Sequence, residues 1–179
     1  MINKFIKYLN EIDSVMFEKA DEKEIQHLEE LGKRKLPKEF IRVYQEAMPI
    51  DEIEIYDDIV LYPFDRIEEE NIGAVPGVNI YPYGLLIFAS TLDGDGICID
   101  LNDKNGAIYQ CSHSLLEDEE EISFYKGKMI CKEFSYENII KFSIKLADNY
   151  REFVEKIMDE SLEIYDVIEN IVANYEERL

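Results

Sequence analysis

Positive charge is scarce in this sequence. Nineteen lysine and arginine residues stand against 40 aspartate and glutamate residues, which gives a formal net charge of −21. Phosphate groups repel such a chain, so the composition argues against nucleic acid and anionic membrane surfaces as partners. A basic protein would instead be attracted, at a rate that falls as salt rises. Solubility alone is the other explanation of the charge.

Cysteine and long apolar runs are also limited. The three cysteines, Cys98, Cys111 and Cys131, cannot all pair, and their spacing does not resemble a zinc motif. Cys98 and Cys111 fall in apolar strand patterns, where cysteine serves as a small buried hydrophobic residue, and this suits a reducing compartment. The N-terminus reaches acidic residues before a signal-peptide core develops, and no apolar run approaches the ~20 residues that span a bilayer. We therefore expect a cytoplasmic protein.

Motifs of catalysis and metal binding are missing as well. No P-loop, Rossmann or nucleophile-elbow pattern occurs. His113 follows Cys111 by two residues, but a Cys–His pair needs a third group that orients the base, and the sequence marks none. A calcium loop starting at Asp100 would need an oxygen ligand where Lys104 stands and a glutamate where Cys111 stands. We expect no catalytic residue, metal or cofactor.

What the sequence does contain is one strongly patterned stretch, residues 83–100. An apolar run at residues 85–89 is short enough for a strand buried on both faces. The turn signal Asp93-Gly94-Asp95-Gly96 follows, and then the apolar, β-rich residues 97–99. The pattern predicts a hairpin at the centre of a sheet, with two carboxylates at its tip. A further strand at 107–111 would complete an antiparallel meander.

Helical patterns precede this sheet. Apolar spacing predicts a helix over residues 2–9, and Asp21 with Glu24 predicts a helix start, with Gly32 as its stop. Another helix follows Pro37. Strands are expected near 53–55 and 59–62, a short helical turn or loop at 64–71, and a loop from Pro76 to Pro82.

After the meander we expect a hairpin over residues 123–130 and then helices. Helical spacing runs from Tyr136 to Ile157, and whether it forms one helix or two is left open by Asp148-Asn149. The tail, 161–179, repeats the pattern; docking on the domain is favoured over dimerisation. The order predicts an α+β fold, an antiparallel sheet with helices packed against it and an extra C-terminal helix. We expect a single domain over 1–179, with a core at about 22–158, an N-terminal helix within 1–20 and a C-terminal extension at 159–179.

Four short motifs, in order, resemble those of one known family. LPKEFIRVY (residues 36–44) is similar to the opening-helix motif LP-x-x-(Y/F)-x-x-(F/Y). LYPFDRI (residues 61–67), which is followed by Asn71, is similar to a second motif, L-(Y/F)-P-L-x-x-I…N. Residues 87–100 resemble the hairpin motif IF-x-x…GDG-x-x-x-D. Phe153, with the residues just before it, resembles the motif S-F-x-x-F of the closing helix. The family is SMI1/KNR4, of the SUKH superfamily, and the resemblance covers about residues 22–158. The chain departs from it in having Ala47-Met48-Pro49 after the opening helix and no tryptophan.

The resemblance implies a non-enzymatic, partner-binding α+β module. The family is largely bacterial immunity proteins that neutralise toxins, often nucleases, and its fungal members act in cell-wall regulation. We therefore expect an immunity protein whose partner is a basic toxin domain, with a regulatory or scaffold module as the alternative. An enzyme is the third hypothesis, for which a pocket would have to join His113 to an acid with a displaced pKa. Whether the protein is a monomer or a dimer is not decided by the sequence.

Acidic and aromatic residues near loops are the predicted contacts with that partner. They are Tyr83, Asp93, Asp95, Asp100, Glu117, Asp118 and Glu119. Tyrosine is enriched at interface anchors, and carboxylates bind Arg and Lys strongly. Each has a plainer alternative: Tyr83 as core or rim packing, the tip aspartates as turn residues, Asp100 as a cap of the following turn, and the run 117–121 as a solvated loop.

Overall fold

The computed structural model describes residues 1–12, 16–56, 58–117, 123–125, 128–130 and 133–176. The helices are α1 (Ile2–Asn10), α2 (Glu22–Gly32), α3 (Lys38–Ala47), α4 (Phe64–Gly73), α5 (Gly77–Ile80), the 3-10 helix η1 (Tyr81–Tyr83), α6 (Tyr136–Lys141), α7 (Tyr150–Met158) and α8 (Val167–Glu176). The strands are β1 (Phe17–Glu18), β2 (Met48–Pro49), β3 (Ile53–Tyr56), β4 (Ile59–Leu61), β5 (Leu85–Thr91), β6 (Gly96–Asp100), β7 (Ile108–Cys111), β8 (Ser123–Tyr125), β9 (Lys128–Ile130) and β10 (Ser143–Ala147). The fold is α+β, as predicted, and it includes the extra C-terminal helix.

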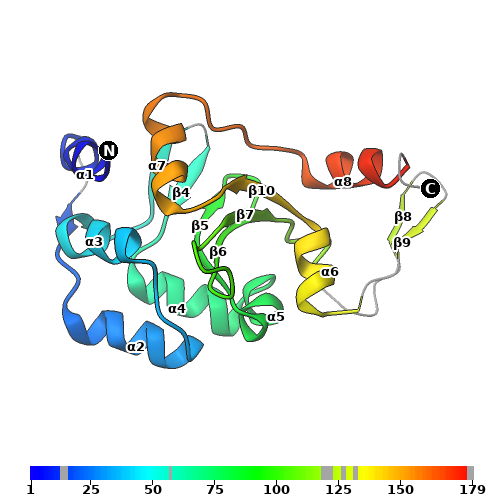
Figure 1. The fold of residues 1–179 in the computed structure, drawn as a ribbon, viewed down its shortest axis with the longest axis horizontal. Helices are drawn as coiled ribbons and strands as arrows, with labels where there is room; N and C mark the ends of the chain where they lie inside the picture. The colour runs from blue at the N-terminus through cyan, green and yellow to red at the C-terminus, as the bar shows by residue number, and fades with distance from the viewer. Residues whose placement is uncertain (13–15, 57, 118–122, 126–127, 131–132, 177–179) are drawn as a thin grey trace.

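A six-stranded antiparallel sheet, ordered β10-β7-β6-β5-β4-β3, forms the centre of the molecule (Figure 1). The predicted hairpin is confirmed as β5 and β6, with Leu85 opposite Asp100 at one end and Ser90 opposite Gly96 at the other. Every residue of both strands is buried. The unbroken apolar run of β5 is therefore that of a strand covered on both faces.

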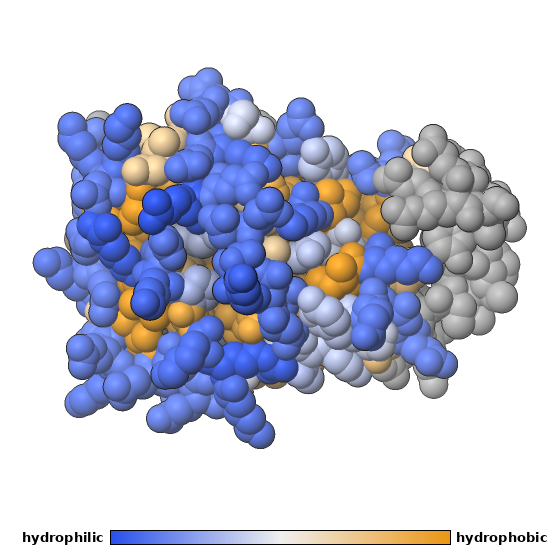
Figure 2. Space-filling model, viewed as in Figure 1, coloured by the Kyte–Doolittle hydropathy of each residue, from blue (hydrophilic) through white to orange (hydrophobic). Residues whose placement is uncertain are grey.

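Aromatic packing fixes the helices to this sheet. The Phe88 ring of β5 makes edge-to-face contacts with Phe40 of α3 and with Tyr150 and Phe153 of α7. Such contacts add to the stabilisation from burial alone. Figure 1 shows α3 and α7 near one another on one side of the sheet and α4 with α5 towards the other. Hydrophilic side chains cover most of the face seen in Figure 2, with apolar residues visible between them.

Helix α4 supplies hydrogen-bond partners for backbone groups of β5 that the short strand β4 leaves unpaired. β4 stops at Leu61, opposite Ala89, so the backbone of Ile87 extends beyond its neighbour. The side chain of Asn71 fills the place of the missing strand residue: its Nδ2 donates to the Ile87 oxygen (2.7 Å), and its Oδ1 accepts from the Ile87 nitrogen (2.9 Å). Buried backbone groups need such partners. Residues 64–71, predicted as a short helical turn or loop, thus belong to a full helix.

The region between 136 and 158 is neither one helix nor two adjoining helices. A strand, β10, separates α6 from α7 and pairs with the edge of β7, with Ser143 opposite Cys111. The Ser143 hydroxyl donates to the Ile139 carbonyl (2.7 Å), a local bond that competes with continuing the helix. The spacing of Ile140, Ile144 and Ala147 indicated a helix, but the segment from Ser143 instead pairs with the free edge of β7.

Smaller predictions also need correction or a further detail. The loop expected between Pro76 and Pro82 contains α5 and η1, because a single turn is too short to show a periodic pattern. Helix α2 ends at Gly32, as predicted, and the residue with left-handed backbone is the next one, Lys33, with φ 50°. In the tail the helix starts only at Val167. The pairing of β8 with β9 confirms the predicted 123–130 hairpin.

The C-terminal segment packs on the rest of the chain, as favoured from the sequence. Leu162, Val167 and Ile171 are buried and belong to the same apolar cluster as the hairpin strands. Helix α8 contacts β10. Among the described residues, no helix is both long enough and apolar enough to cross a bilayer.

Candidate functional site

A cavity of about 380 Å³ lies at the tip of the central hairpin. We call it the tip cavity. It is lined by Asp58, Thr91, Asp93, Asp95, Gln110, residues 112–114 and residues 164–168. The β5–β6 turn, the end of β7 and the C-terminal segment thus form its walls.

Backbone geometry brings two turns together at this cavity. Gly94 has φ +91°, a conformation that glycine adopts without strain, and it allows the chain to reverse between Thr91 and Asp95. The Leu92 nitrogen donates to the Asp58 carbonyl oxygen (2.9 Å), which holds the β3–β4 turn beside the hairpin tip. Asp58 therefore lines the same cavity as Asp93 and Asp95, although 35 residues separate Asp58 from Asp93 in sequence.

The carboxylate of Asp95 is fixed in position by three contacts. Gln110 Nε2 donates to Oδ2 (3.0 Å), and Oδ1 accepts from the backbone nitrogen of His113 (3.2 Å) and lies 3.2 Å from His113 Nδ1. Its side chain is 13% exposed, so the charge is oriented but still reaches the surface. Oriented carboxylates of this kind form stronger contacts with cations than mobile ones do, because less entropy is lost on binding.

The charge around the tip cavity has one sign. Asp58, Asp93 and Asp166 are exposed in its lining, and Asp95 lies beside them. Among the lining residues that the structure describes, none is a lysine or arginine. Acidic groups gathered in a concave surface concentrate the field and attract cations. The arrangement can receive an arginine or lysine side chain from a partner.

The C-terminal wall of the cavity is held by Gln110 of β7. This residue is buried, and its amide binds the backbone of Tyr165 in both directions: Nε2 donates to the oxygen (2.8 Å), and Oε1 accepts from the nitrogen (3.0 Å). The Tyr165 hydroxyl donates to the Glu163 carboxylate (2.7 Å), which raises the pKa of that tyrosine. The tail is thus attached to the sheet by a specific side-chain contact.

His113 meets an acid, Asp95, in this cavity, which is one part of the condition that an enzyme would require. Besides the Asp95 contact, its Nε2 lies 3.1 Å from the Ser114 hydroxyl. Contacts of this type can serve general-base chemistry, but they equally account for a carboxylate held at a turn. Within the described ranges, no group of three or more His, Cys, Asp or Glu side chains is arranged to hold a metal ion.

The structure divides the predicted contact residues between opposite ends of the hairpin. Asp93 and Asp95 lie together at the tip. Tyr83 and Asp100 lie at the other end, because Tyr83 precedes β5 and Asp100 ends β6. The seven residues of β5 separate the two groups by about 20 Å. One compact binding surface therefore does not contain all four.

Asp100 caps the turn that follows it, which is the role predicted as the alternative to a partner contact. It is 1% exposed; Oδ1 accepts from the backbone nitrogens of Asn102 (2.9 Å) and Asp103 (3.3 Å), and Oδ2 from the Tyr136 hydroxyl (2.6 Å). Burial, together with the bond to this carboxylate, raises the pKa of Tyr136. Tyr83 is half-buried, and its carbonyl accepts from Asn102 (2.7 Å).

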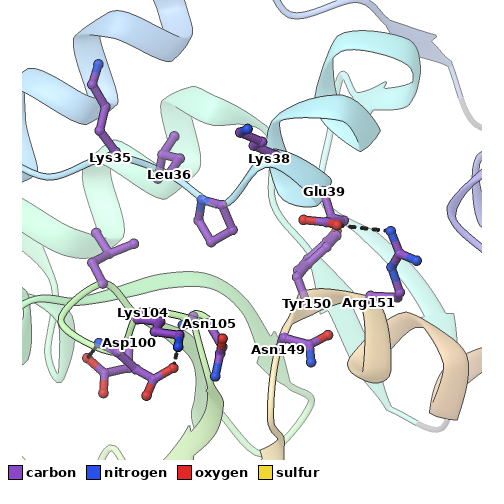
Figure 3. A pocket seen from close by; sticks show the side chains of 14 residues that line it. Lys35, Leu36, Lys38, Glu39, Asp100, Lys104, Asn105, Asn149, Tyr150 and Arg151 are labelled. Atoms are coloured by element: carbon purple, nitrogen blue, oxygen red, sulfur yellow. Dashed lines mark hydrogen bonds and ion pairs between the residues drawn. The ribbon is translucent and has the colours of Figure 1, made fainter.

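A second cavity, of about 560 Å³, lies beside Asp100, between residues 35–39, the 100–106 turn and the start of α7 (Figure 3). Its charges are mixed. Lys35, Lys38 and Lys104 line it, and Arg151 pairs with Glu39 at 3.1 Å. Because opposite charges alternate here, this cavity has no single-signed field comparable to that of the tip cavity.

The acidic run is only partly described. Glu117 is exposed, and its carbonyl accepts from Asn79 Nδ2 (2.7 Å), but it does not line the tip cavity. Asp118 and Glu119 lie outside the described residues. Sequence reasoning did not single out Asp58, Gln110 or Asp166. A polar glutamine inside the apolar strand pattern of residues 107–111 is the one signal that marked Gln110.

Comparison with known proteins identifies a family. The model of the SMI1 / KNR4 family (SUKH-1) matches residues 19–128. This range is more than half of the 179-residue chain and contains Asn71, the central hairpin and most of the tip cavity. No curated protein sequence matches the chain.

Proposed function

The chain belongs to the SMI1/KNR4 family (SUKH-1), and we propose that it is an immunity protein that binds a toxin domain and blocks it without catalysis. The family is largely composed of such proteins. Blocking requires only that the partner's active surface be covered, so no bond has to be made or broken. This role is compatible with a protein that acts in the cytoplasm of the toxin-producing cell.

The observation that carries the proposal is the charge of the tip cavity. Four aspartates line it, and none of its described lining residues is a lysine or arginine, on a chain with a net charge of −21. A basic domain, such as a nuclease that must bind phosphate, would be drawn to this surface. Asp93 would contact an arginine or lysine at the rim, and the fixed carboxylate of Asp95 would contact one deeper in the cavity.

The test is binding and inhibition with the purified toxin domain encoded next to this gene. We expect a one-to-one complex, inhibition that saturates at one equivalent of this protein, and association that slows as salt rises. Inhibition at far less than one equivalent would indicate an enzyme that modifies the toxin. Absence of binding, or binding indifferent to salt, would contradict the proposal.

A regulatory or scaffold module is the alternative, since fungal members of the family act in cell-wall regulation. Gene neighbourhood separates the two roles. An adjacent secreted toxin gene favours immunity, whereas its absence, combined with capture of an endogenous basic protein, favours regulation. The fold itself cannot decide between partners, because they are recognised by surface detail.

A further inference from the structure

Two cysteines meet at the centre of the sheet. The sulfur atoms of Cys98 and Cys111 lie 2.8 Å apart, and both side chains are fully buried. Both thiols are free. The separation exceeds the 2.03–2.05 Å of a disulfide bond by less than about 1 Å. The two atoms are therefore close enough for a covalent bond to need little movement.

The strand register explains why they meet. Cys98 of β6 lies opposite Tyr109, and Cys111 of β7 lies opposite Gly96, so the cysteines are diagonal neighbours on one face of the sheet. The hydrogen-bonded ladder holds the two strands together. Gly96 has no side chain to intervene on that diagonal. The Ser143 hydroxyl, 3.3 Å from Cys111 Sγ, is a further polar contact of the pair.

We propose that Cys98 and Cys111 are an oxidisable pair that forms an intramolecular disulfide when the protein meets a peroxide. One thiolate attacks hydrogen peroxide, which breaks the O–O bond and gives a sulfenic acid and hydroxide. The second thiol then attacks the sulfenic sulfur, the S–S bond forms, and water leaves. In total, two thiols and one peroxide give one disulfide and two waters, with the cysteines oxidised and the peroxide reduced.

Burial makes this reaction slow. It raises the pKa of Cys98 well above its ordinary value, so the reactive thiolate is scarce at neutral pH. A small oxidant such as hydrogen peroxide, which needs only a slight opening of the sheet, is therefore the expected reagent. Raising the pH should accelerate the reaction.

The disulfide would affect the tip cavity because it would join β6 and β7, the two strands that lead to the walls of this cavity. Cys111 directly follows Gln110, which binds both Asp95 and the tail. A disulfide would tie β7 to β6 beside these contacts. It would also constrain the unfolded chain, so the oxidised protein should unfold at a higher temperature.

The test uses the reduced full chain, treated with hydrogen peroxide over a long time course at neutral and mildly alkaline pH. The product is unfolded in N-ethylmaleimide and analysed by mass spectrometry. We expect two of the three cysteines to be protected from alkylation. Before alkylation, the mass of the oxidised chain should be about 2 Da below that of the reduced chain. Peptide mapping should give one linked peptide that joins Cys98 to Cys111, and dithiothreitol should reverse it.

Variants separate this pair from Cys131. Cys131→Ser should keep the reversible bond and the rise in unfolding temperature. Cys98→Ala and Cys111→Ala, checked for folding by circular dichroism, should each lose both. Full alkylation of peroxide-treated wild type, a link to Cys131, or irreversible sulfinic acid in place of the disulfide would each overturn the proposal. None of these results depends on whether the protein binds a toxin.

Discussion

The side chain of Gln110 and the backbone of Tyr165 form a two-way hydrogen-bonded pair, with distances of 2.8 and 3.0 Å. The other proton on the same nitrogen goes to the Asp95 carboxylate (3.0 Å). One buried amide thus joins the hairpin tip, the end of β7 and the C-terminal segment. Asn71 binds Ile87 in the same two-way manner. Each amide thus supplies one donor and one acceptor to the backbone of a residue outside its own element.

Replacement of Gln110 by alanine should detach the C-terminal wall of the tip cavity. It leaves the backbone groups of Tyr165 and one oxygen of Asp95 without their partner, and a buried unsatisfied polar group costs about 1–3 kcal/mol. We expect the free energy of unfolding to fall by about that amount in urea denaturation. Amide hydrogen exchange should also accelerate in residues 162–171.

Gln26→Ala is the matched control, since Gln26 is exposed on α2. Its free energy of unfolding should change by less than about 0.5 kcal/mol. Equal stabilities for the two variants would show that the Gln110 contact does not hold the tail.

Gly77 and Gly73 should respond differently to the same added methyl group. A Cβ at Gly77 would lie 2.0 Å from the Glu70 carbonyl oxygen, whereas a Cβ at Gly73 would meet nothing within 4 Å. Gly77→Ala should therefore destabilise the fold by about 3 kcal/mol, and Gly73→Ala should leave stability within about 0.5 kcal/mol. Thermal unfolding of the two variants measures this. Similar unfolding temperatures would mean that α4 and α5 do not pack as described.

Buried tyrosines should make the fold sensitive to alkaline pH. Burial raises the pKa of Tyr81 to about 12 from an ordinary value of 10.0, and it raises the pKa of Tyr44 and Tyr150 as well. Because the unfolded chain loses these protons first, stability is fully present below about pH 10 and falls as the pH rises through 12.

Phenolate absorbance and circular dichroism, followed together during an alkaline titration, check this expectation. The buried tyrosines should ionise only at a pH above their ordinary value, as the circular dichroism signal is lost. A single ionisation step near pH 10 with no loss of structure would contradict the burial of these rings.

The sequence predicted the parts of the fold whose signals are local. The Asp21–Glu24 capping box is present in both directions, and the apolar run with its Asp-Gly turn forms the central hairpin. The 143–147 strand was not predicted, because its pairing with β7 is a tertiary contact that overrides helical spacing. The same applies to the tail, where the side chain of Gln110 binds the backbone of Tyr165 and the helix begins only at Val167.

The candidate site shows the same division. Asp93 and Asp95 were predicted from their turn, whereas Asp58 and Asp166 reach the cavity from distant parts of the chain. No local pattern relates residues so far apart. Tyr83 and Asp100 were predicted as contacts together with Asp93 and Asp95, but the length of β5 separates the two ends of the hairpin.

Removal of the Asp93 charge tests the account most directly. Asp93→Asn should weaken binding of the adjacent toxin domain at least tenfold, since a charge-assisted contact is worth about 1.5–3 kcal/mol, and should reduce its salt dependence. Glu30→Gln, which removes the same charge from an exposed position on α2 outside the tip cavity, should leave affinity nearly unchanged. The decisive measurement is the dissociation constant of the wild type and both variants between about 50 mM and 500 mM salt. A selective loss in Asp93→Asn is the predicted result, and equal affinities for the two variants would contradict a binding surface at the hairpin tip.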